Sequence, residues 1–155
     1  MKQNTKILLF IFSFLFSQSY NDVKLFYKNG LPKEIHHYRE NNNKVKLAHK
    51  TFYFDNGQKE RKETTLYGLK DGQYTEWRRD GTRKIEGMYE NGDKHGLWVQ
   101  WGKNGRKLKE GMFHRGNKNG SWTKYTENGH KLWEKDYLEG EQIDMRYSGK
   151  NIFEK

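Results

Sequence analysis

After a short apolar run near its start, the chain alternates aromatic residues, glycines and charged residues at a fixed interval. Three blocks of equal length, beginning at Gly72, Gly96 and Gly120, align with one another without gaps. Five columns keep their residue type: the first aromatic (Tyr74, Trp98, Trp122), the second aromatic (Trp77, Trp101, Tyr125), a glycine (Gly81, Gly105, Gly129), a third aromatic (Tyr89, Phe113, Tyr137) and a second glycine (Gly92, Gly116, Gly140). The chain from residue 72 to 143 is therefore a tandem repeat.

Each block predicts a β-hairpin. Asp80-Gly81, Asn104-Gly105 and Asn128-Gly129 are turn dipeptides between two runs rich in aromatic and β-forming residues. A second turn at Gly92, Gly116 or Gly140 leads into the next block within four residues. These connections are too short for a helix, so consecutive strands are expected to pair antiparallel. We expect an all-β, elongated, single-layer meander.

The repeat extends toward both ends in degenerate form. Residues 48–71 keep an aromatic and two glycines in phase, and residues 24–47 repeat the order of aromatic, Asn-Gly and aromatic. Residues 144–155 begin a further copy and stop. The predicted repeat domain is therefore 20–155, with blocks at 24–47, 48–71, 72–95, 96–119 and 120–143 and a partial block at 144–155.

The aromatic columns differ in their expected orientation. Tyr74 and Trp77 are three residues apart, which places them on opposite faces of a regular strand. A bulge, or a sheet that is solvated on both sides, is therefore expected. Gly87 and Gly111 offer no side chain, so an aromatic ring from a neighbouring strand can lie across them.

Residues 1–19 predict a signal peptide, which adds an N-terminal helix to the expected fold. Lys2 and Lys6 precede a run, 7–16, that is apolar except for Ser13, and Ser17-Gln18-Ser19 supplies small residues spaced like a cleavage site. The run is too short to span a membrane, which takes about 20 apolar residues. Cleavage near Ser19 predicts an exported protein of the periplasm, outer surface or medium, with an uncleaved anchor and a buried core helix as the alternatives.

Composition argues against an enzyme. The chain has no cysteine, which excludes thiolate nucleophiles and cysteine-ligated metals, and its six histidines lack the paired spacing of a metal site. No catalytic triad, phosphate loop or cofactor motif occurs, so we expect neither catalysis nor a cofactor. Aromatic residues form 15% of the chain, which favours an ordered fold despite 32% charged residues.

Residues Tyr89 to Trp98, read as YENGDKHGLW, resemble the core of the MORN repeat, and the Gly-x-Trp-x-x-Trp order is similar to its bacterial variant. The resemblance covers roughly residues 24–147 and is strongest over 72–143. It implies a twisted sheet of hairpins extended along one axis, and a role in scaffolding or in attachment to a protein or membrane surface. For some bacterial variants it implies an antitoxin-like role.

Charge points to an anionic partner. The chain carries 30 basic and 20 acidic residues, a net charge of +10. Block 96–119 has six basic residues against Glu110, net +5. Trp98 and Trp101 stand in this block, so we expect contact with an acidic surface, with a solvated face as the alternative. The candidate binding residues are Trp77, Trp98, Trp101, Trp122, Lys103, Arg106, Lys107, Lys109, Arg115 and Lys118.

Two functions are compatible with these features. The first is an exported, non-enzymatic binding or scaffold protein that attaches to a protein partner or to an anionic membrane or envelope surface. The second is an antitoxin or immunity-type inhibitor of a toxin. Export disfavours nucleic acid as a partner, and open sheet edges allow edge-to-edge self-association.

Overall fold

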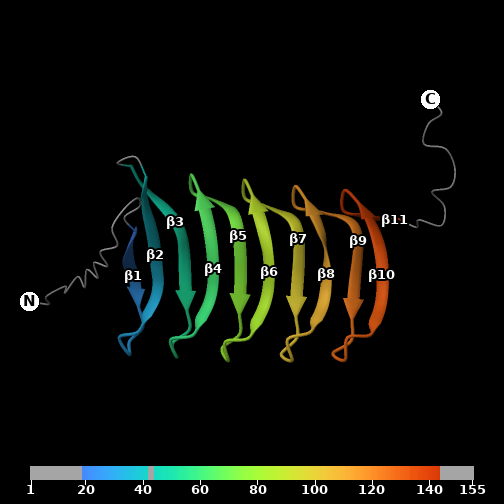
Figure 1. The fold of residues 1–155 in the computed structure, drawn as a ribbon, viewed down its shortest axis with the longest axis horizontal. Coiled ribbons are helices and arrows are strands. Elements are labelled where there is room, and N and C mark those ends of the chain that lie inside the picture. The colour runs from blue at the N-terminus through green and yellow to red at the C-terminus, as the bar shows by residue number, and fades with distance from the viewer. Residues whose placement is uncertain (1–18, 42–43, 144–155) are drawn as a thin grey trace, which may run out of the picture.

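The computed structural model describes residues 19–41 and 44–143, which form one open antiparallel sheet of eleven strands in sequence order. Every strand pairs with its neighbours in the chain, and β1 and β11 lie at opposite ends of the ribbon (Figure 1). The strands are β1 (Ser19–Phe26), β2 (Pro32–Asn41), β3 (Lys44–Tyr53), β4 (Lys59–Leu66), β5 (Leu69–Trp77), β6 (Arg83–Glu90), β7 (Asp93–Trp101), β8 (Lys107–His114), β9 (Asn117–Tyr125), β10 (Lys131–Leu138) and β11 (Glu141–Ile143).

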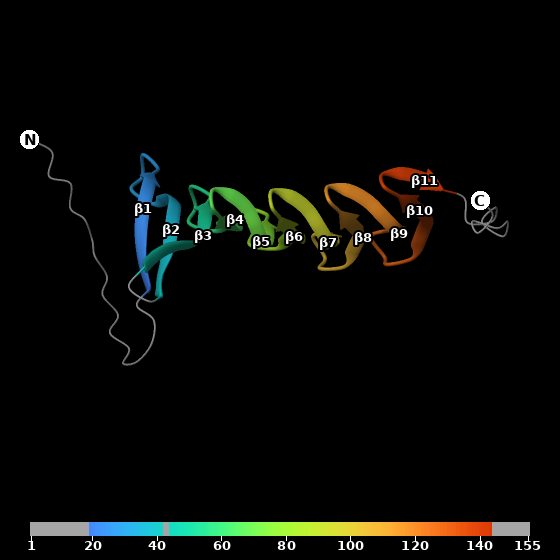
Figure 2. The same cartoon turned by 90° about the horizontal axis from the view of Figure 1, so that it is seen from above.

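The predicted all-β meander is confirmed, and the described residues contain no helix. Seen from above, the sheet is one layer, and among the described residues no second sheet or helix covers either face (Figure 2). Residues 1–18 of the predicted signal peptide 1–19 and the partial repeat 144–155 lie outside the described residues, whereas Ser19 is the first residue of β1. A helix long and apolar enough to cross a membrane is not found in the described part of the chain.

Two kinds of turn alternate along the sheet. In the turns at Gly30, Gly57, Gly81, Gly105 and Gly129, which follow Asn or Asp, only the glycine has a positive φ, as at Gly105 with +76°. Gly105 donates to the Gly102 carbonyl and Gly102 donates to that of Arg106, which gives a five-residue turn. In the other turns both central residues have positive φ, as at Arg115 and Gly116. The primed turns that best match strand twist are thus the second set, which includes Asn91-Gly92 and also Arg115-Gly116 and Glu139-Gly140, where the sequence signal is weaker.

The Asn-Gly turns are linked from one hairpin to the next. The side chains of Asn29, Asn56 and Asn104 each donate to a backbone carbonyl of the following turn, namely Asp55, Arg79 and Glu127, over 2.7–3.0 Å. Their Oδ1 atoms accept from the backbone N–H two residues on, which fixes the turn. The Asp80 carboxylate accepts from the Thr82 backbone N–H, as the asparagines do from theirs, but it has no amide N–H to donate to the next turn.

Replacing Asp80 by asparagine is expected to stabilise the protein, by about 1 kcal/mol, because the added amide can donate to the next turn. Thermal denaturation of Asp80→Asn measures the gain. Asp80→Ala is the control and should lower the melting temperature, because it also removes the acceptor for the Thr82 N–H. A lower melting temperature for Asp80→Asn would contradict the linkage.

The core is a ladder of aromatic rings along one face. Tyr74, Trp98 and Trp122, the first aromatic of each block, are 5–6% exposed. The third aromatic of each block stands edge-on to them, so that Tyr89 and Phe113 contact Trp98 with ring centroids 5.1 and 6.0 Å apart. The ladder continues through Trp122 to Tyr137. Because no single hairpin encloses a ring, each ring is buried only between neighbouring repeats.

Two glycines make room for the tryptophans, as the sequence predicted. A Cβ built on Gly87 would lie 2.3 Å from the Trp98 ring, and one on Gly111 would lie 2.2 Å from the Trp122 ring. Each indole Nε1 donates to a carbonyl of the strand that it crosses, Met88 for Trp98 and Met112 for Trp122, both at 3.0 Å. The same two interactions recur in consecutive blocks, which is the structural basis of the sequence period.

The glycine column is filled where no tryptophan crosses it. Glu63 occupies the position of Gly87 in the preceding block and pairs with Tyr74, whose smaller ring leaves space for a side chain. Glu63 is buried, 7% exposed, and lies 3.3 Å from Arg61 Nε and 3.4 Å from Lys70 Nζ. The early blocks therefore replace ring packing in part by buried charge pairs.

Two histidine rings stack at the N-terminal end of the sheet. His37 and His49 pair across β2 and β3 with ring centroids 4.1 Å apart. Burial, followed by the neighbouring His37 and Lys62, lowers the pKa of His49 to about 4. Burial and Lys62 also lower the pKa of His37.

The stability contributed by His49 should decrease as the pH falls from about 6.5 toward 4. A group whose pKa is lower in the folded state binds fewer protons there than in the unfolded chain, so protonation favours unfolding in this window. Melting temperatures of the wild type and of His49→Asn between pH 7 and 4 measure the effect. The variant should lose less stability on acidification, whereas His130→Asn, in an exposed turn, should follow the wild type; equal acid sensitivity of His49→Asn and the wild type would contradict the expectation.

Candidate binding surface

The strand register assigns each side chain of the sheet to one of two faces. Residues that are direct partners in neighbouring strands lie on the same face, and residues alternate along each strand. Two rows of partners define the face of the aromatic ladder over β7 to β10: Trp98, Gly111, Trp122 and Lys135 in one, and Gln100, Lys109, Lys124 and Trp133 in the other. The row of Glu86, Val99, Glu110, Thr123 and Glu134 defines the opposite face.

Five lysines share the aromatic face of strands β7 to β10, which we call the lysine face. Lys94 lies on β7, Lys109 on β8, Lys118 and Lys124 on β9, and Lys135 on β10. None of the five forms an ion pair among the described residues. The lysine face therefore carries uncompensated positive charge.

Several of these lysines lie over the aromatic ladder. The Lys94 ammonium is 4.4 Å from the Trp98 ring centroid and 5.0 Å from that of Phe113. Lys118, at the equivalent position of the next block, lies 5.1 Å from Trp122 and 4.5 Å from Tyr137. Cation–π attraction holds each ammonium on the sheet without neutralising its charge.

The acidic residues of the same strands all stand on the opposite face. These residues are Asp93, Glu110, Glu134 and Asp136. On that face bases are paired: Arg83 with Glu86, Lys107 with Glu110 and Lys131 with Glu134. Tyr125 and Trp101 donate to two of these carboxylates, Glu110 at 2.8 Å and Glu86 at 3.1 Å. One face is thus neutralised within the molecule and the other is not.

The pKa of Lys109 reflects this crowding of positive charge. It lies below the usual value for lysine, chiefly because of burial and then because of the nearby Lys118 and Lys124. The carboxyl group of Glu110, one residue along, has a lowered pKa because Lys107 hydrogen-bonds to it. An anion placed on the lysine face would relieve the repulsion around Lys109.

The structure divides the tryptophans that the sequence grouped as binding residues. Trp98 and Trp122 are buried in the ladder and offer almost no surface to a partner. Trp77 and Trp101 stand on the opposite face and are half-buried. Trp98 and Trp101 therefore do not form one exposed aromatic patch.

The basic block 96–119 is likewise divided. Lys109 and Lys118 lie on the lysine face, and Lys107 pairs with Glu110 on the opposite face. Lys103 and Arg106 lie in the turn between β7 and β8, and Arg115 lies in the turn between β8 and β9. The six bases do not form a single surface.

Sequence reasoning missed Lys94, Lys124, Lys135 and Trp133. Lys94 belongs to a block with no net charge, and Lys124 and Lys135 belong to a block of net −2, so charge counted by block conceals these three lysines. Charge counted by strand face would have found them, because the acids of the same strands point to the other side.

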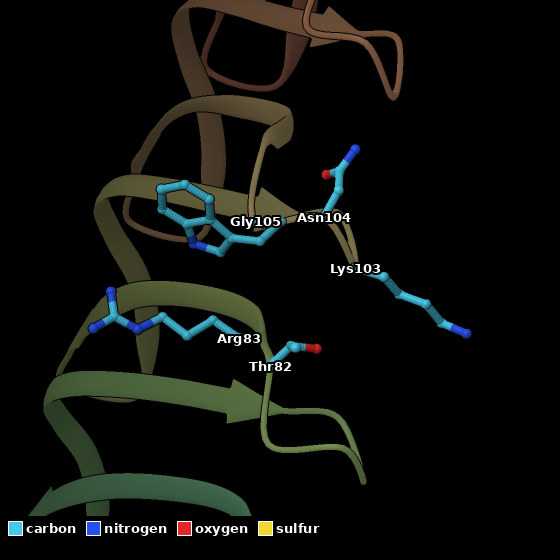
Figure 3. Close-up of a pocket in the computed structure, with 6 residues that line it drawn as sticks. Thr82, Arg83, Lys103, Asn104 and Gly105 are labelled. Carbon is cyan, nitrogen blue, oxygen red and sulfur yellow. The ribbon is translucent and has the colours of Figure 1, made fainter.

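A shallow hollow beside the turn between β7 and β8 is a concave feature of the described sheet. It is lined by Thr82, Arg83, Trp101, Lys103, Asn104 and Gly105. Arg83 and Lys103 extend in opposite directions from it (Figure 3), and Arg83 is paired with Glu86 at 3.0 Å. The hollow therefore has no convergent charge for a ligand. Within residues 19–41 and 44–143, no three His, Asp or Glu side chains are grouped as a metal ion would require.

No protein-family model matches this chain, and no curated protein matches it. The resemblance to MORN repeats consequently rests on the motifs quoted above.

Proposed function

We propose that the protein is an exported, non-enzymatic binding or scaffold module of MORN-like hairpin repeats, which attaches to an anionic protein or envelope surface through the lysine face. The observation that carries the proposal is the separation of charge between the faces of β7 to β10. Five lysines that form no ion pair with any described residue stand on one face, whereas the acids of these strands stand on the other, where Glu110 and Glu134 have lysine partners. The export of the protein is inferred from the N-terminal sequence pattern alone.

A single-layer sheet suits attachment better than catalysis. Its two faces are open, and its aromatic residues are used to hold neighbouring hairpins together. The ammonium groups of the lysine face have no carboxylate partner among the described residues. Negative charges on a facing surface would therefore attract them. The large area and flatness of the ribbon favour a macromolecular partner over a small ligand.

Reversing charge on the lysine face should weaken attachment to isolated envelope fractions by about tenfold or more, since each cation near an anionic surface contributes about 1 kcal/mol. The test variant is Lys124→Glu with Lys135→Glu, both exposed. The matched control is Lys107→Glu with Lys131→Glu, exposed lysines of β8 and β10 on the opposite face, which changes net charge equally. Co-sedimentation at physiological salt measures binding, and equal loss in both variants would overturn the proposal.

The second function, inhibition of a toxin, would use the basic block 96–119 as its contact. That block is spread over two faces and two turns, so a toxin would have to contact only part of it. The same pair of variants tests this function in a co-expression assay. If rescue from a toxin fails with the lysine-face variant and persists with the control, the partner is a protein with an acidic surface.

A further inference from the structure

We propose that the occupant of the lysine face is a linear polyanion, a chain of phosphate-type groups that lies across strands β7 to β10. This inference rests on the proposed function and names the chemistry of its partner. Three features of the face carry it: the spread of the charges, the absence of exposed large apolar side chains from its described paired positions, and the covered rings.

The charges are too widely spread for one small anion. Lys94 and Lys118 occupy equivalent positions two strands apart, about 9.5 Å along the ribbon axis. Lys118 and Lys124 pair with Phe113 and Lys109, which are four residues apart on β8, so the two lysines are separated by about 14 Å along the strand direction. A single phosphate can therefore neutralise one or two of the five ammonium groups, whereas a chain with an anion at every unit can reach them all.

The face is not built to enter a bilayer. The exposed large apolar side chains Leu97, Met112 and Leu138 of these strands stand on the opposite face. Leu132 is the unpaired residue at a register shift between Lys131 and Trp133. Peripheral membrane binding draws on buried apolar area in addition to charge. The lysine face supplies the charge without the apolar component.

The rings are not available to stack on bases. Trp98 and Trp122 are 6% and 5% exposed, and lysine ammonium groups lie over both. Trp133 on the same face is half-buried, and the Lys109 and Lys135 ammonium groups lie 5.8 and 5.6 Å from its ring centroid. Proteins that bind single-stranded nucleic acid present open aromatic faces, each of which contributes about 1–3 kcal/mol per base. A nucleic acid would offer this surface only its backbone, so a polyanion without bases is the better match.

The test measures binding of the full chain to long-chain inorganic polyphosphate, tripolyphosphate, single-stranded DNA and vesicles rich in anionic phospholipid. The lysine-face variant Lys124→Glu/Lys135→Glu and its opposite-face control are run in parallel, with circular dichroism to show that both fold. We expect polyphosphate to bind at least about tenfold tighter than tripolyphosphate at equal phosphate concentration, and the lysine-face variant to lose this binding. When log affinity is plotted against log salt concentration, the slope should become shallower by about 1 for each lysine removed.

Each outcome decides between specific alternatives. Tighter binding of polyphosphate that is sensitive only to the lysine-face variant supports the inference. Equal affinity for tripolyphosphate, or tighter binding of DNA, overturns it. Vesicles that bind more tightly than polyphosphate and are released by the lysine-face variant overturn it too, while leaving the proposed function intact. Equal effects of both variants on every ligand would overturn the inference and the proposed function together.

Discussion

Replacing Gly111 by alanine is expected to destabilise the protein by about 3 kcal/mol, since overpacking of a tight core forces rings and backbone apart. The added Cβ would lie 2.2 Å from the Trp122 ring, so the indole has to leave its place across β8. Its hydrogen bond to the Met112 carbonyl and its edge contact with Phe113 would be lost with it. Thermal denaturation and the wavelength of indole emission measure the change.

The expected loss of stability is opposite to the intrinsic preference of β-strands for alanine over glycine. Alanine in a strand interior is ordinarily favoured over glycine by about 0.5–1 kcal/mol. Gly105→Ala is the control: apart from its two chain neighbours, no described residue lies within 4 Å of its added Cβ, and only the φ of +76° opposes it, at about 1 kcal/mol. Gly105→Ala should lower the melting temperature without shifting the emission. A Gly111→Ala protein as stable as the wild type would contradict the crossing of Trp122.

Replacing Trp98 by alanine is expected to cost about 3–5 kcal/mol, as for large aromatic residues in other cores. Trp98 joins Tyr74 and Tyr89 of the preceding hairpin to Phe113 of its own hairpin, with ring centroids 5.1–6.0 Å apart. Its removal therefore weakens the junction between repeats in the middle of the ribbon. Unfolding in denaturant should shift to lower concentration and separate into two transitions, because the two halves lose their main contact.

Trp101→Ala is the matched control, in the same strand on the opposite face. Trp101 is half-buried and donates one hydrogen bond to Glu86, so its loss should cost about 1–2 kcal/mol and leave a single transition. If Trp98→Ala proved as mild as Trp101→Ala, the assignment of Trp98 to the core would be wrong. The two variants also separate effects on stability from effects on binding. Because Trp98 is buried, weaker attachment of Trp98→Ala would follow from unfolding and not from a lost contact with the partner.

The candidate site was only partly predictable. Lys109 and Lys118 were expected to bind and do lie on the lysine face, and their contribution to binding stays a prediction. Lys94, Lys124 and Lys135 were missed because they stand in blocks of zero or negative net charge. In a count of charge along the chain, the Asp and Glu residues of these blocks offset the lysines. Trp98 was expected to contact a partner, yet the repeat that makes it conspicuous in the sequence is the same repeat that buries it.

The sequence by itself determined the strands, the turns, the antiparallel meander and the crossing of rings over Gly87 and Gly111. These follow from local features: alternation within a strand, a glycine where φ is positive, and a period that repeats the same contacts. Only the tertiary structure decided which side chains of different strands share a face. Trp98 and Lys109 are separated by an odd number of positions, as are Lys109 and Lys124, and such separations would alternate in one continuous strand. The lengths of the turns and the bulges between strands bring all three to one side, and no count along the chain contains that information.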